Sequence, residues 1–408
     1  MKALFFPLSP GAGLAHAGAC LSVASELVAR GAESVIAYGG TRSDLIKGEG
    51  IRIVEVDEMP IEGFDDHNHL TAALPELADL PDRIDRDRQL IEAEKPDVVV
   101  IDMRFSAAPA AELAGVPTVT LNHFFSATGY SQLNSGRRRL GMLRHPLHVA
   151  TRIESIFERD PFGARELTER LAAARRHLGL GPGEGLPIIG PCTAFTTTAE
   201  LDPPSRPLPD GWHLVGPVTW SASGGTKPPP KSNRPLVFAS QGTLGSPAAI
   251  GEISKKLAGL DADIAIVTMG AVSPELIEAP GSGITALEVV DNDAWLAAAD
   301  VAVMHGGHLS MSAAARAGTP TVVIPDGRDH WAWAAKVGRL GTGIPIYRPI
   351  SPGKIGRAVR KVLTEDSYRA RAAELAQNLQ GCSGEADTAD LIEGVAITPD
   401  LGLGSRRD

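Results

Sequence analysis

The most constraining stretch of this sequence runs from Val301 to His330, where two short apolar runs enclose a glycine turn and an alanine-rich segment. The runs VAVM and TVVI have the composition of buried strands, and the segment between them favours a helix that Gly318 can end. A glycine turn between a buried strand and a helix leaves backbone N–H groups at the positive helix end, which suits an anion such as phosphate. This stretch therefore predicts an α/β fold that carries an anion site.

Three polar side chains lie in or beside this turn, namely His305, His308 and Ser310. Their imidazole and hydroxyl groups can add donors for an anion, and a buried polar ring is costly unless it faces a ligand or water. Because glycine turns are common in every α/β fold, packing alone is the alternative interpretation of Gly306 and Gly307.

Strand-type and helix-type segments alternate along the chain in two successive series. A stretch rich in glycine, serine and proline separates the two series and has the composition of a linker. We therefore predict two Rossmann-like, doubly wound parallel-sheet domains that face a cleft. The expected division is an N-terminal domain over residues 1–215, a linker over 216–235, a C-terminal domain over 236–380, and a helix and tail over 381–408 that is placed to pack back on the N-terminal domain.

Helical periodicity predicts long helices over residues 17–30, 74–94 and 152–178. Asp293 is expected to cap the short helix that follows it. The segment over residues 122–150 has no clean period, and its length favours a functional loop over a mere connection.

Composition excludes several classes of protein. The formal net charge of −10 over 408 residues, with no basic block, argues against a nucleic-acid-binding protein. No apolar run reaches the roughly 18 residues of a membrane span, so membrane insertion is not expected. Cys20, Cys192 and Cys382 form no paired motif, which argues against a disulfide framework or a zinc site and favours the cytoplasm. Pro7 and Pro10 interrupt the N-terminal apolar run, so a strand and a loop are expected there instead of a signal peptide.

Two further positions suit chemistry. His16 follows a glycine-containing loop after the first strand, at the position where a dinucleotide-binding fingerprint would need its third glycine, so a nicotinamide cofactor is not predicted. A helix-terminal histidine without chemistry is the alternative. Asp102 ends the apolar strand VVVID, where a carboxylate points into the crevice that binds ligands in α/β sheets. Capping of the following helix is the alternative for Asp102.

The string HGGHLSMSAAARAGTPTVVIPDGRDH resembles the donor-site signature of bacterial nucleotide-sugar glycosyltransferases with the two-domain GT-B architecture. These are the antibiotic and macrolide type, which is related to UDP-glycosyltransferases. The usual signature is HGGxGT, then AGVP, a strand, and P-x-x-x-DQ. The resemblance implies a hexosyltransferase with an acceptor-binding first domain and a second domain that binds a nucleotide sugar, with no metal and no cofactor beyond this donor.

The resemblance also implies a donor site. His305, Gly307, His308 and Ser310 would lie around the diphosphate, while Asp329 and His330 match the Asp-Gln pair that bonds the sugar hydroxyls. Leu309 replaces the usual glycine, His330 replaces glutamine, and many relatives carry another histidine at Met304, so which imidazole meets the phosphate stays open. The complete predicted donor set is Gly13, Gln241, Gly242, Thr243, Val290, His305, Gly307, His308, Leu309, Ser310, Asp329 and His330.

In this family a histidine of the first loop, normally within GHxxP, is the general base, and an aspartate pairs with it. Here the local string is AHAGA, which keeps His16, and Asp102 would hold one tautomer of that ring. The predicted acceptor-binding residues lie on irregular segments of the first domain, and the phenylalanine among them can equally be core. They are His67, Asn122, His123, Phe124 and Tyr130.

Two acidic pairs, Asp261 with Asp263 and Asp291 with Asp293, imitate a metal-binding DxD motif. The first pair enters a strand at the end away from the cleft, and Asp293 is better explained as a cap, so no metal is predicted. The sequence thus predicts an inverting glycosyltransferase that moves a sugar from a UDP- or TDP-sugar to a small-molecule acceptor. The alternatives are a nucleotide-sugar epimerase of the same architecture and a non-catalytic helper of a partner transferase. A homodimer is a possible assembly of the protein.

Overall fold

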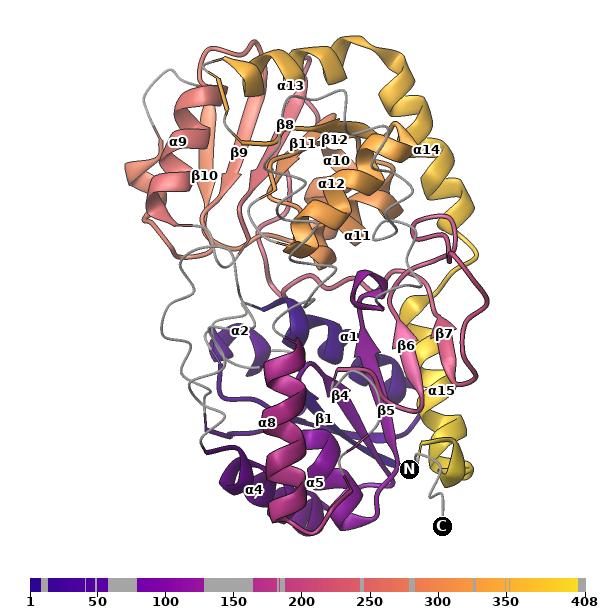
Figure 1. Cartoon of the computed structure of the whole chain (residues 1–408). Helices are drawn as coiled ribbons and strands as arrows, with labels where there is room; N and C mark the ends of the chain where they lie inside the picture. Colours follow the sequence, from indigo (N-terminus) through magenta and orange to yellow (C-terminus); the bar gives the residue numbers. More distant parts are fainter. Residues whose placement is uncertain are drawn as a thin grey trace.

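The computed structural model has two lobes, each built on its own parallel sheet (Figure 1). It describes residues 1–8, 14–40, 42–47, 50–57, 79–127, 164–181, 183, 188–242, 246–278, 283–325, 328–348, 350–351 and 353–402. Among these residues no helix is both long and apolar enough to cross a membrane.

The first sheet has seven strands in the order β3-β2-β1-β4-β5-β6-β7, and its paired strands are all parallel. Helices α1 and α15 cover one face, and α4, α5 and α8 cover the other, which explains why the central strands are apolar throughout. The strands are β1 (Lys2–Pro7), β2 (Glu33–Ala37), β3 (Arg52–Val54), β4 (Val98–Asp102), β5 (Thr118–Asn122), β6 (Thr193–Phe195) and β7 (Trp212–Leu214). The helices are α1 (Ala15–Ala29), α2 (Ser43–Lys47), α4 (Leu80–Glu94), α5 (Ala107–Ala114) and α8 (Ala164–His177).

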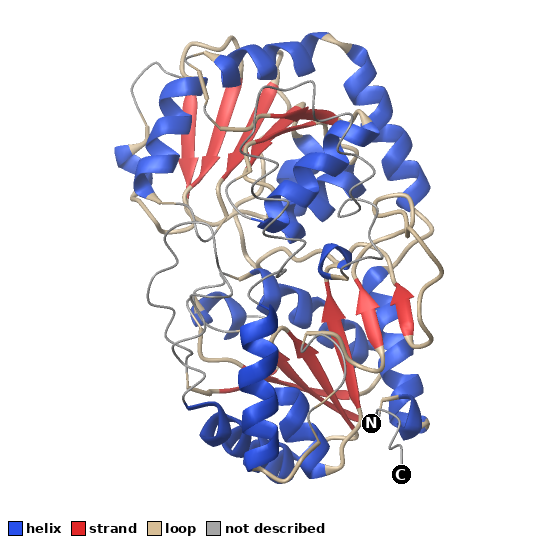
Figure 2. Cartoon of the chain, viewed as in Figure 1, coloured by secondary structure: helices blue, strands red, loops and turns tan. Residues whose placement is uncertain are grey.

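The second sheet has six parallel strands in the order β10-β9-β8-β11-β12-β13. Helices α9 and α13 pack on one face, and α10, α11, α12 and α14 pack on the other (Figure 2). The strands are β8 (Leu236–Ser240), β9 (Asp263–Val267), β10 (Ile284–Leu287), β11 (Val301–Met304), β12 (Thr321–Val323) and β13 (Gly343–Pro345). The helices are α9 (Pro247–Leu257), α10 (Asn292–Ala298), α11 (His308–Ala317), α12 (Arg328–Leu340), α13 (Lys354–Thr364) and α14 (Asp366–Leu379). The prediction of two doubly wound parallel sheets is therefore confirmed.

The chain returns to the first lobe at its carboxyl end. Helix α15 (Gly384–Ile397) packs against α1, and its Ala389, Ile392 and Val395 are part of the first lobe's core. Arg30 at the end of α1 reinforces this contact, because its guanidinium donates to Asp390 at 2.5 Å and to Glu393 at 3.0 Å. Figure 1 shows the N-terminus and α15 in the first lobe.

Each sheet reverses its strand order beside its first strand, and such switch points are where α/β sheets bind ligands. In the first sheet the switch lies between β1 and β4, and in the second between β8 and β11. The arrows of β5, β6 and β7 point toward the second lobe, and those of β8, β9 and β10 point toward the first (Figure 1). The carboxyl ends of both sheets therefore face each other.

Some elements differ from the prediction. Asp291, not Asp293, caps α10, because its Oδ1 accepts the N–H of Ala294 at 3.1 Å, while Asp293 lies in the first turn. Helix α4 begins at Leu80, and the earlier part of the predicted 74–94 helix up to residue 78 lies outside the described residues. The helix predicted over 152–178 is described only from Ala164. Gly318 ends α11 in the left-handed conformation, as predicted.

Candidate active site

A histidine–carboxylate pair lies at the switch point of the first sheet. His16 is the second residue of α1, and Asp102 is the last residue of the neighbouring strand β4. The Nδ1 atom of His16 lies 2.8 Å from the Oδ1 atom of Asp102, whose side chain is almost fully buried. An ionised carboxylate only accepts hydrogen bonds, so Nδ1 carries the hydrogen and Nε2 is the basic nitrogen. The predicted hydrogen bond is present, and the ring has the tautomer that a general base requires.

Cys20 lies one turn farther along α1 and is buried. Burial, and then the charge of Asp102, raise the pKa of the Cys20 thiol well above its usual value. The thiolate is the nucleophilic form, so this cysteine does not compete with His16 for chemistry.

His123, at the end of β5, lies between His16 and the second lobe. Its ring is nearly parallel to that of His16, with centroids 6.0 Å apart, and stacks on that of His308 at 3.8 Å. Desolvation lowers the pKa of His123 well below its usual value, and the neighbouring His308, His16 and Lys336 lower it further. His123 is therefore a neutral ring at neutral pH.

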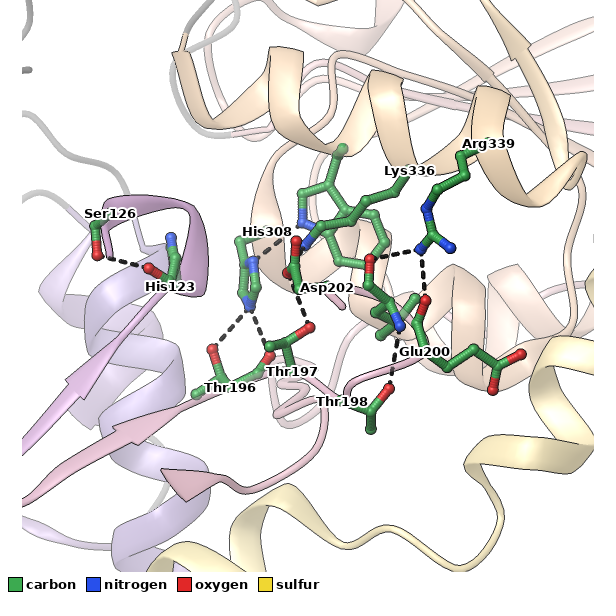
Figure 3. A network of polar contacts seen from close by, with 12 residues as sticks. His123, Ser126, Thr196, Thr197, Thr198, Glu200, Asp202, His308, Lys336 and Arg339 are labelled. Atoms are coloured by element: carbon green, nitrogen blue, oxygen red, sulfur yellow. Dashed lines mark hydrogen bonds and ion pairs between the residues drawn. The ribbon is translucent and has the colours of Figure 1, made fainter. Parts of the chain in front are cut away.

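His308 begins α11 and is buried between the lobes. Trp333 of α12 donates its indole N–H to Nδ1 at 3.0 Å, while Nε2 lies 2.8 Å from the hydroxyl of Thr196 and 3.2 Å from its carbonyl oxygen. Figure 3 shows the contacts to Thr196. Both ring nitrogens thus bond protein groups, and the place of His308 beside a diphosphate, which the resemblance implied, stays a prediction.

Leu309 is another residue of the predicted donor set. Its side chain is part of the first lobe's core, where α11 contacts α1. The larger side chain at this position therefore joins the two lobes. Val290 is likewise buried in the second lobe's core, and its backbone forms a bridge with Thr226.

The structure brings together four other residues of the predicted donor set. The His305 ring lies against Gly242 and Gly307, where a Cβ atom would come within 2.7 and 2.5 Å of it, so a side chain at either position would require the ring to move. His330, at the start of α12, meets His305 edge to face with ring centroids 4.4 Å apart. Gly307 is also the N-cap of α11, so the free N–H groups of this helix begin beside His305.

The remaining residues of the predicted donor set contribute little to this cluster. Ser310 lies in the first turn of α11, and the amide of Gln241 donates to the carbonyl of Ser240 at 3.3 Å. Asp329 is in the first turn of α12, but its side chain lies outside the described residues. Gly13 and Thr243 lie outside them altogether.

Two of the predicted acceptor-binding residues, Asn122 and Phe124, are buried and have partners within the protein. Asn122 donates to the carbonyl of Ile188 at 2.6 Å, and its Oδ1 accepts from the backbone N–H of His123 at 2.7 Å and the hydroxyl of Ser126 at 2.9 Å. Phe124 is 1% exposed and packs edge to face on Phe195. The sequence suggests loop residues at both positions. In the structure, they are packed at the carboxyl end of β5. His67 and Tyr130 lie outside the described residues.

A buried ion pair beside the histidines was not predicted. Lys336 of α12 lies 2.5 Å from Asp202, and both side chains are at most 2% exposed. The Thr197 hydroxyl donates to the same carboxylate oxygen at 3.0 Å, and the Lys336 ammonium lies 4.3 Å from the centre of the Trp333 ring. No local pattern marks these residues, because the partners are far apart in sequence and belong to different lobes.

The two acidic pairs have protein partners. Arg234 lies 3.5 Å from Asp261 and 3.3 Å from Asp263, at the start of β9. Asp291 is engaged as a helix cap. Within the described part of the chain, no cluster of three or more His, Cys, Asp or Glu residues is arranged to hold a metal ion.

Known proteins resemble this chain in sequence. Residues 252–388 match the family described as Erythromycin biosynthesis protein CIII-like, C-terminal domain. The chain is 28% identical over 311 residues to a PGL/p-HBAD biosynthesis rhamnosyltransferase of Mycobacterium bovis (strain BCG / Pasteur 1173P2). The aligned region covers 72% of this chain and 66% of the relative. The chain is 26% identical over 421 residues to 4'-demethylrebeccamycin synthase of Lentzea aerocolonigenes, covering 95% of this chain and 98% of that protein.

Solved structures share the fold over nearly the whole chain. The glycotransferase of kitacinnamycin superposes with a TM-score of 0.71 at 22% identity, covering 96% of this chain and 98% of that one. The glycosyltransferase VinC, solved in complex with DTDP, superposes with a TM-score of 0.68 at 18% identity, covering 98% and 100%.

Two facing doubly wound sheets of this kind define the GT-B fold of glycosyltransferases. Within that class, the chain is similar to glycosyltransferases of antibiotic and other secondary-metabolite biosynthesis. It spans 66% of the length of the mycobacterial relative and nearly all of the demethylrebeccamycin synthase.

Proposed function

We propose that this protein is an inverting glycosyltransferase that moves a sugar from a UDP- or TDP-sugar to a hydroxyl group of a small molecule. The observation that carries the proposal is the His16–Asp102 hydrogen bond of 2.8 Å at the carboxyl edge of the first sheet. This edge faces the second lobe, where the helix N-terminus at Gly307 and the ring of His305 lie together.

In the proposed reaction, Nε2 of His16 takes the proton of the acceptor hydroxyl. The oxygen lone pair forms the new bond to the anomeric carbon from the face opposite the diphosphate, which inverts the configuration. The bond from that carbon to the diphosphate oxygen breaks, and its electron pair leaves with the diphosphate. Asp102 stabilises the imidazolium that forms on His16.

The donor half of the proposal is supported by the α11 N-terminus and His305. Backbone N–H groups at a helix N-terminus favour negative charge, and they need no metal ion to do so. His330 in the first turn of α12 is the proposed sugar contact, and its ring meets that of His305 edge to face. A thymidine diphosphate is one candidate product, since the similar VinC was solved with DTDP.

The test is the substitution His16→Ala, assayed with UDP-glucose, TDP-glucose and a panel of phenolic acceptors. General base catalysis contributes roughly 10²–10⁴-fold, so we expect kcat to fall by about that factor. Nucleotide binding, measured as the thermal shift with UDP or TDP, should stay unchanged because His16 lies in the other lobe.

Other results would indicate other functions. Unchanged turnover in His16→Ala would exclude this residue as the base. Conversion of the donor without any acceptor would identify an epimerase. Nucleotide binding in the wild type with no conversion of any donor would favour the non-catalytic helper.

A further inference from the structure

Three imidazole rings form a row that crosses from the first lobe to the second. His16 lies on α1, His123 follows β5, and His308 begins α11. The planes of His16 and His123 differ by 13°, and those of His123 and His308 by 17°, so all three rings share nearly one orientation. His123 and His308 are stacked in contact, and the 6.0 Å spacing of His16 and His123 is within the range in which aromatic rings orient each other.

The second-lobe end of this row is fixed by hydrogen bonds. An indole N–H can only donate, so the bond from Trp333 makes Nδ1 of His308 the acceptor. The hydrogen of His308 is then on Nε2, which faces the hydroxyl and the carbonyl oxygen of Thr196. The ring of His308 therefore has one orientation, held by Thr196 and Trp333, which come from different lobes.

The middle ring is fixed through its backbone. The N–H of His123 donates to the side chain of Asn122, which in turn donates to the carbonyl of Ile188. Ser126 bonds both Asn122 and the His123 carbonyl, and the latter contact is drawn in Figure 3. His123 thus meets His308 from a segment that is held by hydrogen bonds to Asn122 and Ser126.

We propose that Trp333, His308 and His123 are positioning residues for the base His16, so that the second lobe completes the first lobe's catalytic pair. The inference rests on the proposed function, in which His16 accepts the proton. The row holds the plane of the His16 ring and keeps water from the side of it that His123 covers. Since His308 is anchored on α12 through Trp333, this arrangement exists only when the two lobes are joined as they are here.

Removal of the stack has a definite consequence for pH dependence. A base ring that gains water on one side has a better solvated imidazolium form, because burial disfavours the charged form. His16 would then be protonated at higher pH, and the acid limb of the kcat/KM profile would move upward in pH. A phenylalanine in place of His123 would keep the covering ring, whereas an alanine would not.

The experiment compares two tryptophans that are matched in burial. Trp333 and Trp295 are both 3% exposed, and Trp295 donates its indole N–H to the carbonyl of Thr226 at 2.7 Å, away from the row. Trp333→Phe and Trp295→Phe each remove one buried N–H and keep an aromatic ring. We expect Trp333→Phe to lower kcat about 5- to 10-fold and to move the acid limb upward, with nucleotide affinity unchanged.

The remaining variants decide between positioning and other roles. His123→Ala should reproduce the shift of the acid limb, and His123→Phe should largely restore the wild-type limb. Trp295→Phe should leave both kcat and the limb unchanged. Equal effects of the two tryptophan variants, or an effect of Trp333→Phe on nucleotide affinity alone, would overturn the inference.

A readout without substrate separates this inference from the proposed function. The imidazole NMR signal of His16, assigned by its loss in His16→Ala, should move in Trp333→Phe and His123→Ala but not in Trp295→Phe. If the wild type transfers no sugar and the signal moves as expected, the proposed function fails and the coupling holds. If transfer occurs and the signal of Trp333→Phe stays in place, the coupling fails.

Discussion

At the scale of single residues, two contacts join parts of the chain that are far apart in sequence, namely His16 with Asp102 and His308 with Thr196. His16 and Asp102 are 86 residues apart, but both follow from one rule, since the ends of adjacent parallel strands meet at one sheet edge. The hydrogen bond between them is therefore present as predicted, while its catalytic role stays a prediction. His308 could not be placed in this way, because its partner Thr196 is 112 residues away in the other lobe and no local motif records it.

The neutral state of His123 has a consequence for stability. Desolvation, His308, His16 and Lys336 together lower its pKa in the folded protein, and no such groups act on it in the unfolded chain. Below about pH 6.5 the unfolded chain therefore binds a proton that the folded protein refuses. The contribution of His123 to stability is fully present above that pH. It is lost as the pH falls from there toward the lowered pKa that His123 has in the folded protein.

We expect the free energy of unfolding to fall by at most about 1.4 kcal/mol per pH unit on account of this one group. Urea unfolding of the wild type and His123→Phe at pH 7.5 and 5.5 measures it. The variant should lose less stability between the two values, because its ring cannot be protonated. An identical pH dependence in both proteins would contradict the assignment.

At the scale of elements, local composition predicted most helices and strands, and three-dimensional context decided the exceptions. The alanine-rich α11 and its Gly318 end were predictable from propensity and from the left-handed conformation that glycine allows. Strand β7 has only three partly exposed residues, Trp212–Leu214, and is held in the sheet by pairing with β6, so no periodicity could reveal it. The cap of α10 was assigned to the wrong aspartate of a pair two residues apart, a typical boundary error.

Helix α15 offers a test of its packing on the first lobe with two isoleucines of one helix. Ile392 is fully buried against α1, whereas Ile397 is 82% exposed. Ile392→Ala should cost about 2–5 kcal/mol of unfolding free energy, because it leaves a cavity in the core. Ile397→Ala should stay within about 0.5 kcal/mol. Equal costs, measured by chemical denaturation, would show that α15 does not pack as described.

At the scale of the whole molecule, the two lobes are joined by buried groups and not by the linker alone. Leu201 is fully buried in the second lobe's core, although it follows β6 of the first sheet. Arg339 donates to the carbonyl of Leu201 at 2.8 Å, and Asp202 pairs with Lys336. The sequence predicted the two sheets but not this junction, because its contacts depend on how the lobes dock.

The Lys336–Asp202 pair can be tested by removing one partner. Lys336→Ala would leave a buried carboxylate without its cation, and we expect a loss of about 3–5 kcal/mol of unfolding free energy. The double substitution Lys336→Met with Asp202→Leu should recover part of this loss, since no charge is then left unpaired.

The matched control is the more exposed pair Lys256–Glu252 on α9. Exposed pairs contribute about 0.2–1 kcal/mol at most, so Lys256→Ala should change the free energy of unfolding by no more than that. A loss in Lys336→Ala as small as in this control would mean that the buried pair does not hold the lobes together.

The return of α15 to the first lobe affects how the protein is made. Asp390 lies 360 residues after Arg30, its partner on α1, so the ribosome synthesises the whole second lobe before this contact can form. Until then, the apolar side of α1 that later meets Ile392 and Val395 stays uncovered on the nascent chain. The first lobe is thus begun first and finished last.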